Sequence, residues 1–288
     1  MSIWTLGIQQ FLLKDGQRAF KPSELRAIQS QIGIPPSVDL GTFIRQLTEN
    51  QVLREVKLTS PYERIRRFAT AGASRYDIAV SLKTNAYLSH GTAGFLNGIA
   101  AETSIVFLNK EQTPKPQAQV VSQDAIDHSF ANRQRYSTNV YKSNAGDFLL
   151  INGKNTRLFG VERRDHLLVT NLERTLIDMT VRPEYAGGTE NVLKAYKAGA
   201  SRVYLPRFLE TLKALNYVYP YHQAIGFYLQ HAGFPARQLD FLRELGTTFR
   251  FYLGYGKVER GFDEYWCVYY PISLMTAIED PDNKSSPR

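Results

Sequence analysis

The chain has 288 residues, enough for about two domains, and 43% of them are hydrophobic and 12% aromatic, a composition that excludes a disordered chain. It carries 35 basic and 27 acidic side chains, a net charge of +8 that favours polyanionic partners. The single cysteine, Cys267, excludes an internal disulfide framework and any zinc or iron–sulfur site built from several cysteines.

The sequence carries no sign of export or membrane insertion. Its first residues lack a basic segment followed by an apolar run, which a signal peptide requires. Its apolar stretches all fall short of the roughly 18–20 residues that cross a bilayer. We therefore expect a cytoplasmic protein that does not bind membranes.

Residues 1–70 are expected to form three short helices and a β-hairpin. The first helix is predicted over residues 2–14, and the second begins at Pro22, because proline suits the first helical position. A third helix is predicted to be capped by Ser37. Its apolar face is marked by residues at helical spacing: Leu40, Phe43, Ile44 and Leu47.

A basic hairpin is predicted to follow the third helix, with strands over residues 51–58 and 62–68. This order of elements is typical of a winged helix-turn-helix, in which the third helix enters the DNA major groove. Residues 1–70 hold ten Lys and Arg against six Asp and Glu, so half of the excess positive charge lies in this segment. We therefore expect a DNA-binding domain over residues 1–70.

Side-chain type indicates which of these residues would contact DNA. Three on the polar face of the third helix are of types that contact base edges: Thr42, Arg45 and Gln46. Five basic residues of the hairpin are candidates for phosphate contacts: Arg54, Lys57, Arg64, Arg66 and Arg67. A small helical domain whose charged face only meets water is the alternative interpretation.

The rest of the chain predicts a larger mixed domain over residues 71–278, so the expected fold class is α+β. Two helices and a strand are predicted over residues 75–110, and the C-terminal half is expected to be helical. A small antiparallel sheet with a hairpin turn at 152–155 is predicted between them, with strands at 138–141, 147–151, 156–161 and 166–169. Residues 279–288 are polar and are expected to form a disordered tail.

Two segments resemble a known family. They are Tyr87–Ala93 (YLSHGTA) and Leu168–Asp178 (LVTNLERTLID), the latter followed by Arg182–Gly188 (RPEYAGG). Together with the order of the N-terminal elements they resemble the AbiEi family, which comprises antitoxins and transcriptional regulators of abortive-infection toxin–antitoxin operons. The resemblance covers about residues 1–200. It implies repression of the protein's own operon and counteraction of a co-encoded nucleotidyltransferase-like toxin, without implying a direct complex with that toxin.

The sequence contains no phosphate-binding loop, dinucleotide-binding motif or nucleophile elbow, so we expect no enzyme, no cofactor and no metal. Glu173 is interpreted as the acid of a capping box that begins at Thr170, and Asp178 as a helical partner of Arg174. His90 is interpreted as a cap or core residue. The alternative is a nuclease-like enzyme that the N-terminal domain recruits to DNA, in which Glu173 and Asp178 would serve a metal-dependent reaction.

A third hypothesis concerns the aromatic C-terminal half. The family resemblance does not extend to this part of the chain, which is rich in tyrosine. A surface for a ligand or partner is predicted from seven of these residues: Tyr204, Tyr217, Tyr219, Tyr221, Tyr228, Tyr252 and Tyr255. Cys267 is predicted to lie in a strand over residues 266–268 and to pack in the hydrophobic core.

Overall fold

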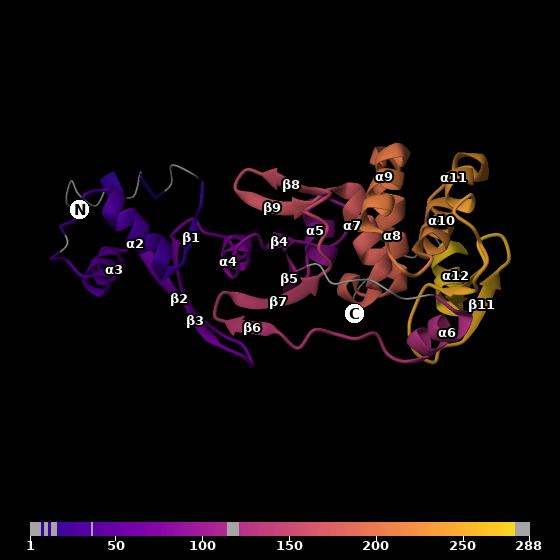
Figure 1. Cartoon of the computed structure of the whole chain (residues 1–288), viewed down its shortest axis with the longest axis horizontal. Helices are drawn as coiled ribbons and strands as arrows, with labels where there is room; N and C mark the ends of the chain where they lie inside the picture. The colour runs from indigo at the N-terminus through magenta and orange to yellow at the C-terminus, as the bar shows by residue number, and fades with distance from the viewer. Residues whose placement is uncertain (1–6, 9–10, 13–15, 36, 114–120, 280–288) are drawn as a thin grey trace.

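The computed structural model describes residues 7–8, 11–12, 16–35, 37–113 and 121–279. The molecule is elongated, with the N-terminal elements at one end, the C-terminal helices at the other and a large sheet between them (Figure 1). The α+β class is confirmed. The predicted first helix lies mostly outside the described residues, as does the predicted tail.

The N-terminal elements form a compact end of the molecule (Figure 1). In chain order they are β1 (Ala19–Phe20), α2 (Pro22–Gln31), α3 (Leu40–Glu49), β2 (Leu53–Thr59) and β3 (Arg64–Thr70). Both β1 and β2 pair antiparallel with β3. The cap of α3 is Asp39, whose carboxylate accepts a hydrogen bond from the Thr42 N–H at 3.0 Å, so the predicted Ser37 cap is wrong. The helix begins two residues later than expected.

The central sheet is mixed and has nine strands in the order β1-β3-β2-β6-β7-β5-β4-β9-β8. The elements that complete it and flank it are α4 (Arg75–Ser81), β4 (Tyr87–Leu88), α5 (His90–Leu96), β5 (Ile105–Glu111), α6 (Gln123–Ala131), β6 (Val140–Ser143), β7 (Gly146–Gly153), β8 (Val161–Arg164) and β9 (Leu167–Thr170). The pairs β5–β7 and β4–β9 are parallel. The predicted small antiparallel sheet is therefore wrong. Its two hairpins, β6–β7 and β8–β9, are separated by β5 and β4, which arrive from earlier in the chain.

The predicted hairpin turn at 152–155 is wrong as well, because β7 and β8 are not neighbours in the sheet. The chain instead leaves β7 and makes a turn at Arg157 and Leu158, whose φ angles are +55° and +57°. The Glu111 carboxylate accepts a hydrogen bond from the Leu158 N–H at 3.2 Å and holds this turn against the end of β5. The predicted strand over residues 156–161 is therefore wrong, since of these residues only Val161 lies in a strand, at the start of β8.

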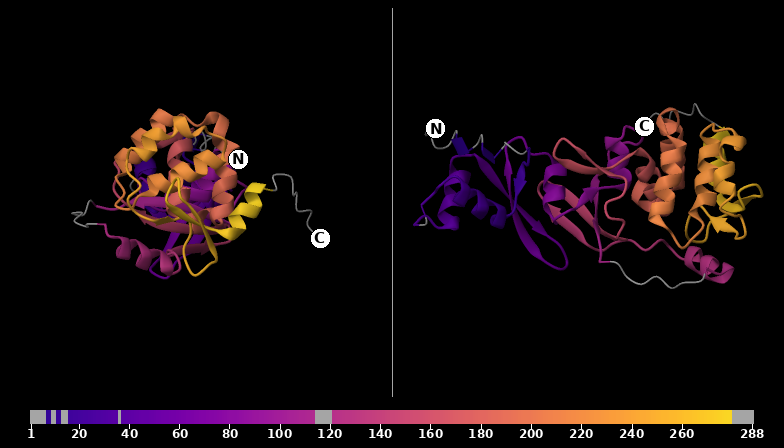
Figure 2. Two further views of the ribbon diagram at one scale, coloured as in Figure 1. Left: turned by 90° about the vertical axis from the view of Figure 1, so that its right-hand side faces the viewer. Right: turned by 45° about the horizontal axis from the view of Figure 1, so that its top comes forward.

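The C-terminal half is helical, as expected, and also holds a three-stranded sheet, which is followed by one more helix (Figure 2). Its elements are α7 (Leu172–Val181), η1 (Pro183–Ala186), α8 (Thr189–Gly199), η2 (Ala200–Arg202), α9 (Leu205–Leu215), α10 (Tyr221–His231), η3 (Ala236–Gln238), α11 (Asp240–Arg243), β10 (Phe251–Tyr252), β11 (Arg260–Asp263), β12 (Val268–Pro271) and α12 (Ile272–Glu279). Strand β12 pairs parallel with β10 and antiparallel with β11.

The tyrosines of this half belong to its hydrophobic core. Tyr221 and Tyr228 are buried, and four more are half-buried and pack against the same cluster as Trp266: Tyr217, Tyr219, Tyr252 and Tyr255. Tyr204 alone of the predicted set is exposed. The predicted aromatic binding surface is therefore not present, since the rings stack on one another and on core residues. Cys267 is half-buried in the turn before β12, with a φ of +55°, so its predicted place inside a strand is also wrong.

A second hydrophobic cluster joins the N-terminal hairpin to the central sheet. Val56 and Ala69 of the hairpin pack in the same cluster as Leu88, Val106 and Phe148 of strands β4, β5 and β7. The predicted boundary at residue 70 therefore falls within a shared core.

Candidate functional site

Helix α3 presents the polar side chains that the sequence singled out. Arg45 and Gln46 are exposed, and Thr42 is half-buried. The Thr42 hydroxyl donates to Asp39 Oδ2 at 2.8 Å and accepts a hydrogen bond from Arg45 Nη2 at 3.4 Å. Hydrogen bonds from Thr42 lower the pKa of the Asp39 carboxyl, which favours its anionic form at the helix N-terminus. The predicted base-contacting residues thus form one polar group on the exposed side of α3.

The hairpin places three of its basic side chains on one face. In the β2–β3 register Lys57 lies opposite Arg66, and Thr59 lies opposite Arg64. Because side chains alternate along a strand, these four share a face with Phe68, which packs in the cluster formed with α2 and α3. The exposed side chains of Lys57, Arg64 and Arg66 therefore lie on the side of the sheet that carries α3.

Arg54 and Arg67, which were also predicted to contact phosphates, lie on the face of the hairpin opposite Lys57. Arg67 is only 5% exposed, and it donates hydrogen bonds to the carbonyls of Ser81 at 2.9 Å and Leu82 at 2.8 Å, at the end of α4. Burial lowers the pKa of its guanidinium. The prediction that Arg67 contacts phosphate is wrong, because its donors are used inside the protein. Arg54 is exposed on this opposite face, beside the Ala73 carbonyl.

A further basic residue, which the sequence did not indicate, extends the face that holds Lys57. Thr59 pairs with Lys142 of strand β6, and paired residues project from the same side of a sheet. Lys142 is exposed. It lies about eighty residues along the chain from the hairpin, and no local pattern connects the two. We call this surface the basic sheet face, and its members are Lys57, Arg64, Arg66 and Lys142.

The basic sheet face places like charges close together. Lys57 and Arg66 are directly opposite across the hairpin, an arrangement that destabilises a strand pair unless an anion lies between or beside them. Glu55 supplies part of that negative charge, with an Arg66 Nη1 to Glu55 Oε1 distance of 3.3 Å. The other charges are open to solvent and can bind an external anion.

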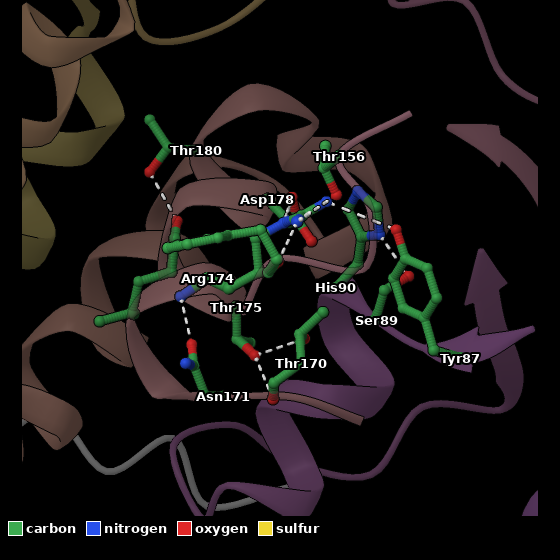
Figure 3. Close-up of polar contacts among 12 residues, drawn as sticks. Tyr87, Ser89, His90, Thr156, Thr170, Asn171, Arg174, Thr175, Asp178 and Thr180 are labelled. Atoms are coloured by element: carbon green, nitrogen blue, oxygen red, sulfur yellow. Dashed lines mark hydrogen bonds and ion pairs between the residues drawn. The ribbon is translucent and has the colours of Figure 1, made fainter. Parts of the chain in front are cut away.

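A separate buried polar network centres on Arg174 (Figure 3). Its Nε donates to Asp178 Oδ1 at 2.9 Å, and both side chains are almost fully buried, which confirms the predicted helical pair. The N-cap of α7 is Asn171, which accepts a hydrogen bond from the Arg174 N–H. The predicted capping box is therefore wrong. Glu173 instead accepts a hydrogen bond from the Tyr204 N–H at 3.0 Å, away from Asp178.

His90 is buried next to this network and is a core residue, as expected. Its Nδ1 lies 2.8 Å from Ser89 Oγ (Figure 3). Its ring packs edge-on against Tyr185. Burial lowers the pKa of His90 to about 4, so the imidazole is neutral at pH 7. Its φ of +51° is uncommon for a residue with a side chain.

Within the described ranges, no group of three or more His, Cys, Asp and Glu side chains could hold a metal ion. The His166 Nε2 atom makes a hydrogen bond with Asp77 Oδ1, on α4. Among the helices of the described part, none is long and apolar enough to cross a membrane.

Neither a family model nor a curated protein matches the chain. Among solved structures, the chain is similar to the crystal structure of the RV2827C protein from Mycobacterium tuberculosis, with 13% sequence identity and a TM-score of 0.56. The similarity covers 98% of this chain and 95% of that chain. At this identity the similarity concerns the fold alone.

Proposed function

We propose that this protein is a DNA-binding transcriptional autorepressor and the antitoxin of a toxin–antitoxin operon. The observation that carries the DNA-binding part is the polar group of α3, with exposed Arg45 and Gln46, on the side of the sheet that bears the basic sheet face. The order β1, α2, α3, β2, β3 is consistent with a winged helix-turn-helix, in which the helix before the hairpin enters the major groove.

The polar side chains of α3 and the basic sheet face have different roles in DNA binding. Arg45 and Gln46 contact guanine and adenine edges, and Thr42 contacts a base or the backbone. The basic sheet face contacts phosphates, which fixes the position of α3 on the duplex without reading sequence. Arg54 and Arg67 are left out of this interface because they lie on the opposite face of the hairpin.

The antitoxin part rests on the resemblance to the AbiEi family. The two segments that carry it are distant in sequence but adjacent in the sheet, since Leu88 of β4 pairs with Val169 of β9 in parallel. A contiguous unit built from both segments supports one shared role for them. The functional partner is a co-encoded nucleotidyltransferase-like toxin, the protein itself is not an enzyme, and both act in the cytoplasm.

The experiment that tests DNA binding is fluorescence anisotropy with the protein's own upstream DNA and a scrambled duplex, across a salt series. We expect tighter binding to the upstream DNA and a steep loss of affinity with salt. Arg45→Ala should reduce the preference for the upstream DNA. Lys57→Ala should weaken binding to both duplexes and reduce the salt slope by about one.

Arg54→Ala is the matched control, because it removes an exposed arginine of the same hairpin from the opposite face. It should leave affinity, preference and salt slope close to those of the unmodified protein. Equal weakening by all three substitutions would contradict the assigned interface. Equal weak binding of the unmodified protein to both duplexes would contradict the repressor function.

A further inference from the structure

The side of the sheet that bears the basic sheet face continues past the hairpin onto the central strands. Lys142 of β6 pairs with Asp147 of β7. Two residues further along, Val140 pairs with Leu149, so both project from the same side of the sheet as Lys142. Tyr185 packs in one cluster with Leu149 and Val140. It therefore lies over the same side of the sheet as the basic sheet face.

The segment between α6 and β6 is fixed on this side of the sheet by specific contacts. The Ser137 N–H donates to the Tyr185 hydroxyl at 2.8 Å, and the ring of Tyr136 packs on that of Tyr185 with 4.7 Å between their centroids. At the tip of the hairpin, the Tyr62 hydroxyl lies 2.8 Å from Thr138 Oγ1. The segment thus adjoins the hairpin tip and runs along the same side of the molecule as the hairpin (Figure 1).

This segment presents two arginines to solvent, Arg133 and Arg135, and both are exposed. Gln134 between them is buried, and its Oε1 accepts a hydrogen bond from the Glu184 N–H at 3.3 Å. Within the described part of the chain, no hydrogen bond or ion pair uses the guanidinium of either arginine. The same holds for the side-chain nitrogens of three members of the basic sheet face: Lys57, Arg64 and Lys142.

Together with the basic sheet face, the two arginines form a tract of six exposed cations, which we call the basic tract. Three carboxylates lie on or beside it: Glu55, Asp147 and Glu184. Six cations against three carboxylates leave the basic tract positive, and a positive tract that runs along one side of a protein favours an extended polyanion.

The basic tract is long enough to follow a DNA duplex for about one helical turn. Because β6 runs antiparallel to β2 and Lys142 pairs with Thr59, Val140 lies beyond the end of β2, on the side away from α3. At about 3.3 Å per residue, the stretch from Leu53, which packs with α3, to Thr59 spans about 20 Å. The step from Lys142 to Val140 adds about 7 Å, and the two arginines lie further on. One turn of B-DNA is about 34 Å.

We propose that Arg133 and Arg135 contact phosphates of the DNA backbone about one helical turn away from the site of α3. The duplex then lies along the whole basic tract, and Lys142 contacts the backbone between the two sites. Phosphate contacts of this kind add affinity without reading base sequence. The proposal rests on the proposed DNA binding and extends that interface from the hairpin to the central sheet.

Fluorescence anisotropy of the full chain with duplexes of about 15 and 35 base pairs, both centred on the same upstream sequence, tests the proposal. The shorter duplex ends before it reaches the two arginines. The double variant Arg133→Gln/Arg135→Gln should bind the long duplex at least fivefold more weakly than the unmodified protein, and the short duplex less than twofold more weakly. Since each phosphate contact contributes about one to the salt slope, the slope on the long duplex should fall by about two.

Lys213→Gln/Arg237→Gln is the matched control, because it removes two exposed cations outside the basic tract. Lys213 lies in α9 and Arg237 in η3, next to α11, and both α9 and α11 lie across the molecule from β6 (Figure 1). This variant should bind both duplexes as the unmodified protein does. Thermal denaturation checks that both double variants are folded.

The outcomes separate this proposal from the repressor function. Equal weakening on both duplexes, or none on the long one, would overturn the extended contact and leave the α3 interface, which Arg45→Ala tests. Length-dependent weakening without any preference of the unmodified protein for upstream DNA would support the extended contact and contradict the repressor function. Tighter binding of a single strand than of the long duplex would overturn the proposal, because exposed Tyr62 and Tyr136 would then stack on unpaired bases. No binding of any DNA would overturn both.

Discussion

Buried charged side chains connect distant segments of this protein through specific backbone atoms. Arg67 donates a hydrogen bond to the Ser81 carbonyl at the end of α4. Glu173 accepts a hydrogen bond from the Tyr204 N–H at the start of α9, and Arg174 donates one to the Phe159 carbonyl at 2.7 Å. A buried charge without such partners would cost several kcal/mol. These residues therefore act as structural links, although each resembles a surface or catalytic residue when only its sequence neighbourhood is considered.

His90 makes the stability of the protein depend on pH. The unfolded chain titrates this imidazole at about pH 6.5, whereas burial lowers the pKa in the folded state to about 4. Between these values the unfolded state binds a proton that the folded state does not. The contribution of neutral His90 to the free energy of unfolding is fully present above pH 6.5 and is lost as the pH falls toward 4. At pH 4 the loss should be about 3 kcal/mol of the free energy of unfolding.

Urea unfolding at pH 7 and pH 4 measures this loss in the unmodified protein and in His90→Asn, since asparagine tolerates a positive φ. The variant should lose less stability between the two pH values, by about 3 kcal/mol. Burial also lowers the pKa of His222 and His231, but these residues are present in both proteins and cancel in the difference. The same pH dependence in both proteins would show that His90 is not the titrating group.

At the scale of elements, α10 packs against Trp266 through a glycine. A Cβ at Gly226 would overlap the indole ring, which is 1% exposed and donates through Nε1 to Gln230 Oε1 at 2.7 Å. Replacing glycine by alanine in an open helix stabilises it by about 0.8–1 kcal/mol. Here we expect Gly226→Ala to destabilise the protein by about 1–3 kcal/mol, because the helix must move away from the ring.

Chemical denaturation of Gly226→Ala with and without Trp266→Leu tests this packing. The smaller leucine side chain leaves room for the added methyl group, so the cost of Gly226→Ala should fall to near zero in the Trp266→Leu background. Additive effects of the two substitutions would contradict direct contact between α10 and the ring at this position.

At the scale of the whole molecule, the N-terminal hairpin and the central sheet share one hydrophobic cluster. Val56 of β2 is fully buried in it, together with Val106 and Phe148. We expect Val56→Ala to lower the free energy of unfolding by about 2 kcal/mol. Since the cluster is continuous, faster hydrogen exchange should appear in β5 and β7 as well as in β2 and β3.

Hydrogen exchange followed by mass spectrometry measures this spread. Leu193 of α8 lies in the separate C-terminal cluster, so Leu193→Ala is a matched control that should leave exchange in β2 and β3 unchanged. Faster exchange confined to β2 and β3 in Val56→Ala would show that residues 1–70 unfold as an independent domain.

The sequence by itself determined the elements whose signals are local. The apolar spacing of α3, the basic hairpin and the helical pair of Arg174 and Asp178 depend on residues within a few positions of one another, and each is present in the structure. Tertiary structure alone decided the rest. Parallel pairing of β5 with β7 and of β4 with β9 joins strands far apart in the chain, as does the placement of Lys142 beside the hairpin. These contacts depend on how apolar faces pack in three dimensions, and side-chain alternation along a strand does not specify the partner strand.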